Sequence, residues 1–196
     1  MEQPSRKQRI VIGISGASGA VYGVRLLELL KDTDIETHLV ISRAAQITIA
    51  HEMRRKIAEV TALADVVYGS DDIAAAISSG SFKTMGMIIA PCSMRSLGEI
   101  SSGVTTSLLT RAADVVLKER RRLVLMVRES PLHLGHLKLM VAATEMGAII
   151  SPPVPAFYAQ PKSVDDVVDH TVGRVLDLFD IELGVVKRWK SIEPNR

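Results

Sequence analysis

The stretch that decides the fold is Ile10-Val-Ile-Gly-Ile14, followed at once by Ser15-Gly-Ala-Ser-Gly-Ala20. The first part is a short β-branched run, typical of a buried strand, and the second is rich in small residues, as in a tight turn. Residues 21–31 then follow a helical pattern. The order strand, tight turn, helix indicates the opening unit of an α/β domain with a parallel sheet.

Apolar runs of strand length recur along the chain, with enough sequence between them for helices. They cover 37–41, 87–90, 123–127 and 148–150, with 65–68 as a weaker candidate. The last helix is expected over about 164–179 with Ser163 as its N-cap, after a stiff proline-rich loop at 152–155. We therefore predict a single α/β domain: a three-layer α/β/α arrangement with a mainly parallel sheet, Rossmann-like or flavodoxin-like.

Composition excludes several classes of protein. The chain has 196 residues, 4% aromatic residues and a net charge of +2, which disfavours nucleic-acid binding through either phosphate neutralisation or base stacking. No apolar run approaches the roughly 18 residues of a membrane span, and the basic residues 1–9 carry no signal core. Cys92 is the only cysteine, as suits a reducing cytosol. We expect a cytoplasmic protein with a flexible N-terminus (1–8), one domain (9–190) and a tail (191–196).

Ligands of an open parallel sheet bind beyond the carboxyl ends of its strands, so the loops there are the first candidates for a site. The first loop has glycines at 13, 16 and 19, which differs from the dinucleotide pattern G-x-G-x-x-G. Phosphate binding, with free amides supplied by the following helix, and a plain strand-to-helix turn both remain open. Ser42 and Arg43 stand where an NAD site would have an acidic residue, which favours a mononucleotide or flavin.

Two later loops allow both a chemical and a structural interpretation. Residues 91–96, Pro-Cys-Ser-Met-Arg-Ser, could cradle a phosphate, or form an ordinary turn beside a buried Cys92. Arg128-Glu129 follows the strand at 123–127. It offers a phosphate-binding cation and an acid or base, or a structural salt bridge.

Three other patterns are better explained by structure than by chemistry. The basic run 118–122 ends a helix whose apolar face we expect to include Val104, Leu108, Ala112, Val115 and Val116, and cations suit a helix C-terminus. His133 and His136 lack an evident third metal ligand, so we reject a metal site there. Asp165-Asp-Val-Val-Asp169 spells D-x-x-x-D, but behind Ser163 it is expected to cap a helix.

Taken together, six segments resemble the flavin prenyltransferase family, over about residues 9–189. The segments are Gly13-Ile-Ser-Gly-Ala-Ser-Gly-Ala20, Ser42-Arg-Ala-Ala45, Ile89-Ala-Pro-Cys-Ser93, Arg111-Ala-Ala-Asp-Val-Val-Leu-Lys-Glu-Arg120, Leu123-Val-Leu-Met-Val-Arg-Glu-Ser-Pro131 and Pro155-Ala-Phe-Tyr-Ala-Gln-Pro161. The resemblance implies a dodecamer that binds FMN at a subunit interface. It also implies transfer of a dimethylallyl group from dimethylallyl phosphate to N5 and C6 of reduced FMN, without a metal. The prenylated FMN would serve a partner decarboxylase, of the ubiquinone or aromatic-acid type.

The resemblance also implies roles for individual residues. The flavin contacts would be Gly16, Ala17, Ser18, Ser42, Ser93, Met94, Arg95, Ser96 and Arg128. The substrate phosphate would meet Lys118, Arg128, Tyr158 and Arg174. Glu52 and Glu129 would be the carboxylates at the reacting centre, with Ser18 beside them, and either a carboxylate or the departing phosphate would take the ring proton. The loop Met94-Arg-Ser96 departs from the Thr or Lys-Thr that is frequent in the family.

Two rival functions remain open at this stage. A flavin-dependent cysteine decarboxylase shares the fold, but it relies on a catalytic histidine and a Pro-x-Met-Asn segment, and that segment is missing from this sequence. A non-catalytic flavin-binding subunit of a decarboxylase would share the flavin loops without turnover. The preferred donor, monophosphate or diphosphate, is left undecided by the residues.

Overall fold

The structure, a computed structural model, describes residues 8–189. These residues form two compact units that divide after Pro152, and each is described by itself. The flexible N-terminus expected at 1–8, apart from Gln8, and the tail expected at 191–196 lie outside the described residues.

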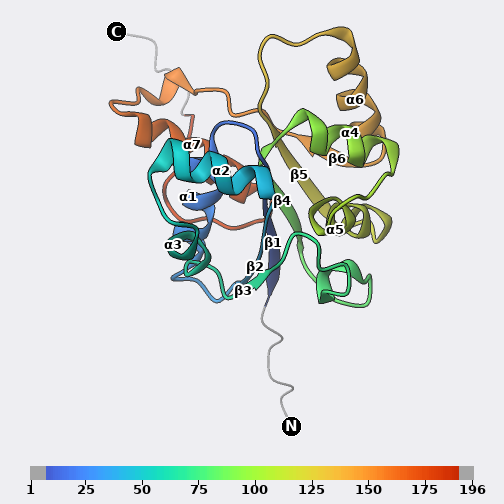
Figure 1. The fold of residues 1–196 in the computed structure, drawn as a ribbon. Coiled ribbons are helices and arrows are strands. Elements are labelled where there is room, and N and C mark those ends of the chain that lie inside the picture. Colours follow the sequence, from blue (N-terminus) through green and yellow to red (C-terminus); the bar gives the residue numbers. More distant parts are fainter. Residues whose placement is uncertain (1–7, 190–196) are drawn as a thin grey trace, which may run out of the picture. The chain divides into compact units, whose positions relative to one another are not determined.

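The first unit is built on a six-stranded parallel sheet (Figure 1). Its strands are β1 (Arg9–Ile14), β2 (Glu36–Ile41), β3 (Val66–Tyr68), β4 (Gly86–Cys92), β5 (Arg122–Val127) and β6 (Ala148–Ile150). The order β3-β2-β1-β4-β5-β6 is that of a Rossmann-type doubly wound sheet, and it reverses between β1 and β4. The predicted α/β class and parallel sheet are confirmed, and each predicted strand is present to within two residues.

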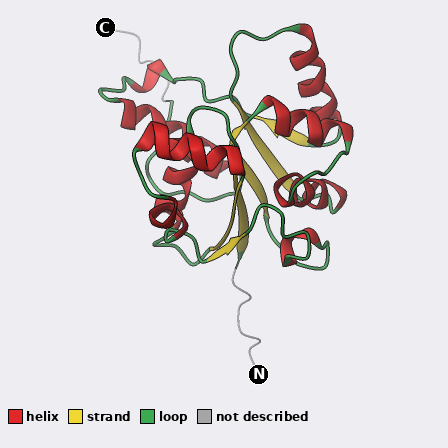
Figure 2. Ribbon diagram, viewed as in Figure 1, coloured by secondary structure: helices red, strands yellow, loops and turns green. Residues whose placement is uncertain are grey.

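Helices cover both faces of this sheet (Figure 2). They are α1 (Ala20–Leu30), α2 (Arg43–Met53), α3 (Ile57–Thr61), the 3-10 turn η1 (Ala76–Ser78), α4 (Met94–Ser102), α5 (Leu108–Lys118) and α6 (Leu134–Glu145). Helix α1 lies on one face, with α2 and α3 beside it, and α4, α5 and α6 lie on the other (Figure 1). The carboxyl ends of β1 and β4 therefore open between the two helical layers.

The alternation of side chains along β1 explains this layering. Ile10, Ile12 and Ile14 are fully buried. A Cβ on Gly23 of α1 would lie 2.8 Å from the Ile14 side chain and 2.3 Å from the carbonyl oxygen of Ala90, so this glycine lets α1 pack directly on the sheet. Gly13 points to the other face, where a Cβ would lie 3.4 Å from Leu109 of α5.

One expectation for α5 is wrong. Leu108, Ala112, Val115 and Val116 are buried as predicted, but Val104 lies before the helix and is 51% exposed. The physical reason is the cap: the Ser107 hydroxyl accepts the N–H of Thr110, which starts the helix after Val104.

The second unit carries η2 (Phe157–Ala159) and α7 (Val164–Asp177). The segment 151–156 contains neither helix nor strand, as its prolines predict. Ser163 caps α7, and the Asp166 carboxylate accepts the N–H groups of Lys162 and Ser163. The capping interpretation of the aspartate run is therefore confirmed. Over residues 8–189, no helix has both the length and the apolar character that crossing a membrane requires.

Candidate active site

Ser15 ties together the two strand ends between which the sheet order reverses. Its hydroxyl donates to the carbonyl oxygen of Pro91 at 2.7 Å and accepts the N–H of Ser93 at 2.7 Å, while its own N–H also bonds Pro91. Because the side chain is almost fully buried, these bonds fix the loops after β1 and β4 relative to each other. The sequence reasoning missed this role, although a serine directly after a buried strand is a usable signal.

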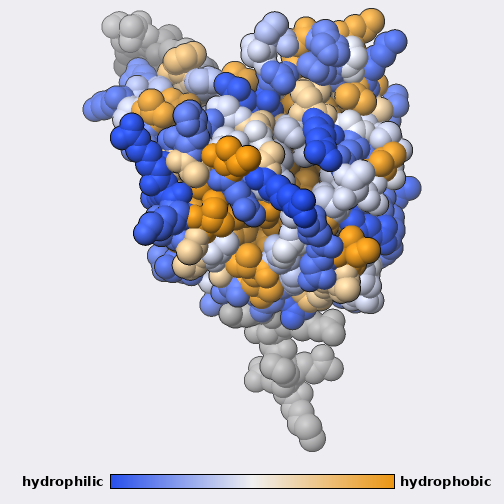
Figure 3. All heavy atoms as spheres, in the orientation of Figure 1, coloured by the Kyte–Doolittle hydropathy of each residue, from blue (hydrophilic) through white to orange (hydrophobic). Residues whose placement is uncertain are grey.

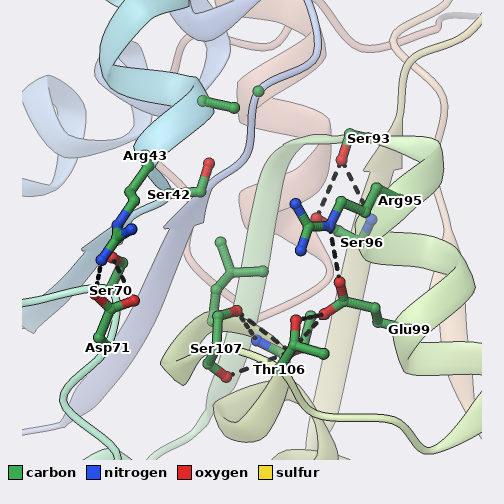
Figure 4. Close-up of a pocket in the computed structure, with 14 residues that line it drawn as sticks. Ser42, Arg43, Ser70, Asp71, Ser93, Arg95, Ser96, Glu99, Thr106 and Ser107 are labelled. Atoms are coloured by element: carbon green, nitrogen blue, oxygen red, sulfur yellow. Dashed lines mark hydrogen bonds and ion pairs between the residues drawn. The ribbon is translucent and has the colours of Figure 1, made fainter.

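A polar cavity of about 510 Å³ opens beside these loops (Figure 4). Three helices begin at it, and each has a serine cap: Ser42 for α2, Ser93 for α4 and Ser107 for α5. The first turn of a helix has unpaired N–H groups and a partial positive charge. Three such ends at one cavity, together with their hydroxyls, make it a binding place for an anionic group.

The cavity also contains two ion pairs (Figure 4). Arg43 pairs with Asp71, and Arg95 Nε lies 2.9 Å from Glu99 Oε1. Glu99 also accepts the hydroxyls of Thr106 and Thr110. Burial alone would raise the pKa of Glu99, but the bonds from Thr106, Arg95 and Thr110 outweigh it and lower the pKa. Both arginine side chains are largely exposed, so they can turn toward an incoming anion.

Gly16 lines the cavity at a place where a side chain has no room. A Cβ at this position would lie 2.4 Å from the Cβ of Ala44 in the first turn of α2. The loop after β1 can therefore pack against the start of α2 only because residue 16 is glycine.

Glu52 lies on α2, and its side chain caps the N-terminus of α1. Its Oε2 atom accepts the N–H groups of Gly19 at 2.9 Å and Ala20 at 3.3 Å, and its carboxylate also bonds the Ser18 side chain. Of the two alternatives left open for this loop, the structure favours the plain strand-to-helix turn, because Glu52 already accepts the Gly19 and Ala20 amides. The helix starts that line the cavity are those of α2, α4 and α5.

Arg128 completes a cluster with Ser18 and Glu52. Burial would raise the pKa of Glu52, but the bonds from Ser18, Gly19 and Ala20 and the positive charge of Arg128 lower it. Arg128 also opposes the rise that burial causes in the pKa of Tyr22. The backbone N–H of Arg128 donates to the carbonyl oxygen of Cys92, which joins the ends of β5 and β4. In this cluster Ser18 bonds the Glu52 carboxylate directly, whereas Arg128 acts on that carboxylate through its charge.

Glu129 is exposed, and its carboxylate accepts the N–H of Ser130 at 3.0 Å. Among the residues described, Glu129 forms no ion pair with Arg128, so the salt-bridge interpretation of this dipeptide is not supported.

Lys118 lies elsewhere in the first unit. It ends α5, its Nζ atom is 2.6 Å from Glu119 Oε1, and a Cβ on Gly80 would lie 2.8 Å from it. Gly80 and Lys118 precede β4 and β5, so this is the amino edge of the sheet, whereas Arg128 follows β5. Within one chain, Lys118 and Arg128 therefore lie at opposite edges of the sheet, because α5 runs back from the carboxyl edge to the amino edge.

The second unit holds the other two residues expected at the substrate phosphate. The hydroxyl of Tyr158 is 3.3 Å from Nε2 of His170. Arg174 forms an ion pair with Asp177, whose carboxylate is also bound by Arg188 at 2.5 and 2.8 Å.

Two residues weighed for chemistry have structural roles. Cys92 is fully buried, and burial raises the pKa of its thiol to about 12, which confirms that it is a small core residue. His133 caps α6 by accepting the N–H of Gly135, with its ring 3.6 Å from that of His136. Within residues 8–189, no three His, Cys, Asp or Glu side chains are grouped so as to hold a metal ion.

The cavity gathers about half of the predicted flavin contacts. Gly16, Ser42, Ser93, Arg95 and Ser96 line it, together with Glu99, Thr106 and Thr110, which the sequence reasoning did not single out. Ala17, Ser18, Met94 and Arg128 do not line it. Met94 is partly buried against the hydrophobic core.

Comparison with known proteins identifies the family. The family model described as Flavoprotein matches residues 1–176. The flavin prenyltransferase UbiX of Escherichia coli (strain K12) is 61% identical over 187 residues, which are 94% of this chain and 99% of that protein. The chain belongs to the UbiX-like flavin prenyltransferases. The expected prenyltransferase class is thereby confirmed.

Solved structures agree with this family. The crystal structure of AnUbiX (PadA1) in complex with FMN and dimethylallyl pyrophosphate has a TM-score of 0.94 and 49% identity, over 96% of this chain and 100% of that one. A dodecameric FMN-dependent UbiX-like decarboxylase from Escherichia coli O157:H7 has a TM-score of 0.92 and 49% identity, over 94% of this chain and 100% of that one. The cysteine decarboxylase TvaF is only 14% identical, with a TM-score of 0.61, which shows a shared fold and nothing more.

Proposed function

We propose that this UbiX-like flavin prenyltransferase moves a dimethylallyl group from dimethylallyl phosphate to N5 and C6 of reduced FMN, without a metal. The product, prenylated FMN, would be passed in the cytoplasm to a decarboxylase that uses it. The observation that carries the proposal is the cluster of Ser18, Glu52 and Arg128 in a chain of this family.

The cavity at the starts of α2, α4 and α5 suits the phosphate of FMN. Its serine caps and backbone amides can donate to phosphate oxygens, and Arg43 and Arg95 can add charge. Gly16 supports this assignment, because it is the residue of the β1 loop that lines the cavity and it brings no side chain into it. Reduced FMN would supply the nucleophilic N5 and C6 atoms and a π surface for the allyl group.

The substrate phosphate leaves with the electron pair of its bond to the allyl carbon, so it must be met by cations and hydrogen-bond donors. Arg128, Arg174 and the Tyr158 hydroxyl are the groups that we assign to it. We assign Lys118 to the site of a neighbouring subunit, since it lies at the opposite edge of the sheet in its own chain. This assignment accords with the homododecamer that we propose for the protein.

The two carboxylates differ in their surroundings. Glu52 is held ionised by three donors and the nearby Arg128, so it is placed to stabilise positive charge and to orient Ser18. Glu129 is exposed and accepts the neighbouring Ser130 amide, and we assign it to face the substrate. Either carboxylate or the departing phosphate would accept the proton lost from C6.

The proposal is tested by following inorganic phosphate when the purified protein alone is mixed, without oxygen, with reduced FMN and dimethylallyl phosphate. We expect one phosphate for each flavin consumed, and an unchanged rate in the presence of a chelator. Absence of turnover in a folded, FMN-loaded protein would support a non-catalytic flavin-binding subunit instead. Substituting dimethylallyl diphosphate shows which donor is preferred.

Glu129→Gln is expected to retain FMN and to lower kcat by about 100-fold or more, as loss of a general base or charge stabiliser does. The bound flavin is measured by absorbance, and turnover by phosphate release. Lys31→Gln, an exposed change at the C-cap of α1, is the control that should leave both unchanged. Full turnover of the Glu129 variant would remove this residue from the mechanism.

A further inference from the structure

The ring of Tyr158 is held between two other aromatic rings in the second unit. The centroid of the His170 ring lies 5.6 Å away with an interplanar angle of 83°, and that of Trp189 lies 5.1 Å away at 82°. Both are edge-to-face contacts, the arrangement that aromatic pairs favour. The 3-10 turn η2 that carries Tyr158 is further fixed by Lys187, which donates to the carbonyl oxygen of Ala159 at 3.1 Å.

His170 approaches Tyr158 with a nitrogen atom as well as with its ring. It lies on α7, is 8% exposed, and places Nε2 3.3 Å from the phenol oxygen. Tyr158 as a residue is 45% exposed. A nearly buried polar group thus bonds the hydroxyl of a side chain that is only partly covered by the chain.

The number of protons fixes the direction of this bond when an anion is present. A phenol has one proton and two lone pairs, and a phosphate at neutral pH offers mainly acceptors. If Tyr158 gave its proton to His170, it would have none for the phosphate. The bond can serve anion binding only with His170 as the donor through Nε2–H.

We propose that His170 is a positioning residue that donates to the Tyr158 oxygen, so that the Tyr158 O–H points to a phosphate oxygen of the prenyl donor. The inference rests on the proposed function, because it takes Tyr158 as a phosphate ligand. Donation into the phenol oxygen also polarises the O–H bond and strengthens it as a donor. His170 does not touch the substrate and acts through Tyr158 alone.

A double-mutant cycle separates this role from mere packing. Tyr158→Phe removes the hydroxyl, and His170→Leu keeps an apolar side chain but removes the donor. Each single variant should raise KM for dimethylallyl phosphate by about tenfold or more, the value of one hydrogen bond to a charged group. The double variant should equal Tyr158→Phe alone, because His170 has nothing left to orient. His170→Gln, which retains an N–H donor, should stay within about twofold of the wild type.

A second readout does not depend on turnover. Trp189 is the only tryptophan of the chain and contacts the Tyr158 ring, so its fluorescence can follow binding of inorganic phosphate. The phosphate dissociation constant should rise by about tenfold or more in both single variants and no further in the double. Thr171→Val is the matched control: Thr171 is as buried as His170 on the same helix, and its hydroxyl donates to the carbonyl oxygen of Val167, one turn earlier. It should leave phosphate binding unchanged.

The outcomes distinguish the two proposals. A wild type that binds phosphate but forms no prenylated flavin would overturn the proposed function and leave the cycle to decide on His170. An active wild type in which His170→Leu has no effect, or in which the two losses multiply in the double variant, would overturn the role of His170. Phosphate that leaves Trp189 fluorescence unchanged in every protein would overturn it as well.

Discussion

Glu52 decides which anion site the fold can offer. In an α/β sheet of this order, the N-terminus of the first helix is the usual place for a phosphate. Here the carboxylate of Glu52 takes the Gly19 and Ala20 amides and the Ser18 hydroxyl. The proposed function therefore places the flavin phosphate at the cavity beside α2, α4 and α5 instead.

The lowered pKa of Glu52 predicts a pH dependence of stability. A carboxyl whose pKa is lower in the folded state stabilises the fold above its unfolded pKa of about 4.3, and that contribution is lost as the pH falls through the folded pKa. Glu52→Gln, which cannot ionise, should therefore lose less stability than the wild type between about pH 6 and pH 3. Urea unfolding at both values measures this. Equal losses in the two proteins would contradict the capping role.

Contacts between individual residues that are distant in sequence are the hardest feature to predict from the sequence. Family resemblance grouped Lys118 with Arg128, but no local pattern reports that α5 returns to the amino edge of the sheet. The role of Ser15 cannot be predicted from local sequence, because its partners, Pro91 and Ser93, are more than 70 residues away in the chain. Contacts of this kind are created by strand order, which a single chain reveals only once it is folded.

Gly23 determines how closely helix α1 approaches the sheet. Alanine at this position would gain about 1 kcal/mol in helix propensity, but its Cβ would lie 2.3 Å from the carbonyl oxygen of Ala90. Overpacking a core costs about 1–3 kcal/mol, and here the blocking atom is backbone. Gly23→Ala should therefore destabilise the protein and lower the midpoint of thermal unfolding.

Gly98 of α4 is the matched control. A Cβ there would meet only Leu139, at 3.9 Å, which is an ordinary contact. Gly98→Ala should thus stabilise the protein by about 0.5–1 kcal/mol through helix propensity alone. The same thermal measurement applies, and a stabilised Gly23→Ala variant would show that α1 is not packed as closely as described.

Strands and helix starts can be predicted better than contacts between distant residues, because each strand or helix start depends on nearby sequence. The strands are apolar runs, and the start of α7 follows from Ser163 and Asp166. The start of α5 was misplaced because Val104 continues the helical spacing, while the cap at Ser107 breaks it. Capping chemistry prevailed over apolar periodicity there.

Helix α6 presents exposed apolar side chains along one side of the first unit. Leu134, Leu137 and Val141 lie along one side of it, 65%, 45% and 57% exposed. Ala143 is its only buried residue. Figure 3 shows apolar side chains among those on the upper right of the view, where Figure 1 places α6. An apolar stripe of this kind marks an interface, and the proposed homododecamer supplies the partner.

Leu137→Glu together with Val141→Glu is therefore expected to yield smaller assemblies, because charge is placed where apolar surface should be buried. Light scattering after gel filtration measures the mass. Val67→Glu, at an exposed valine of the edge strand β3, is the control that should keep the full assembly. Retention of the full mass in the α6 variant would show that this helix faces solvent.

The central claim is that the chain prenylates reduced FMN, and the mass of the flavin tests it most directly. The protein is incubated without oxygen with reduced FMN and dimethylallyl phosphate, and the released flavin is examined by mass spectrometry. The account predicts FMN enlarged by one dimethylallyl unit, formed by this protein alone and without added metal. Recovery of unmodified FMN from a folded, FMN-loaded protein would contradict it.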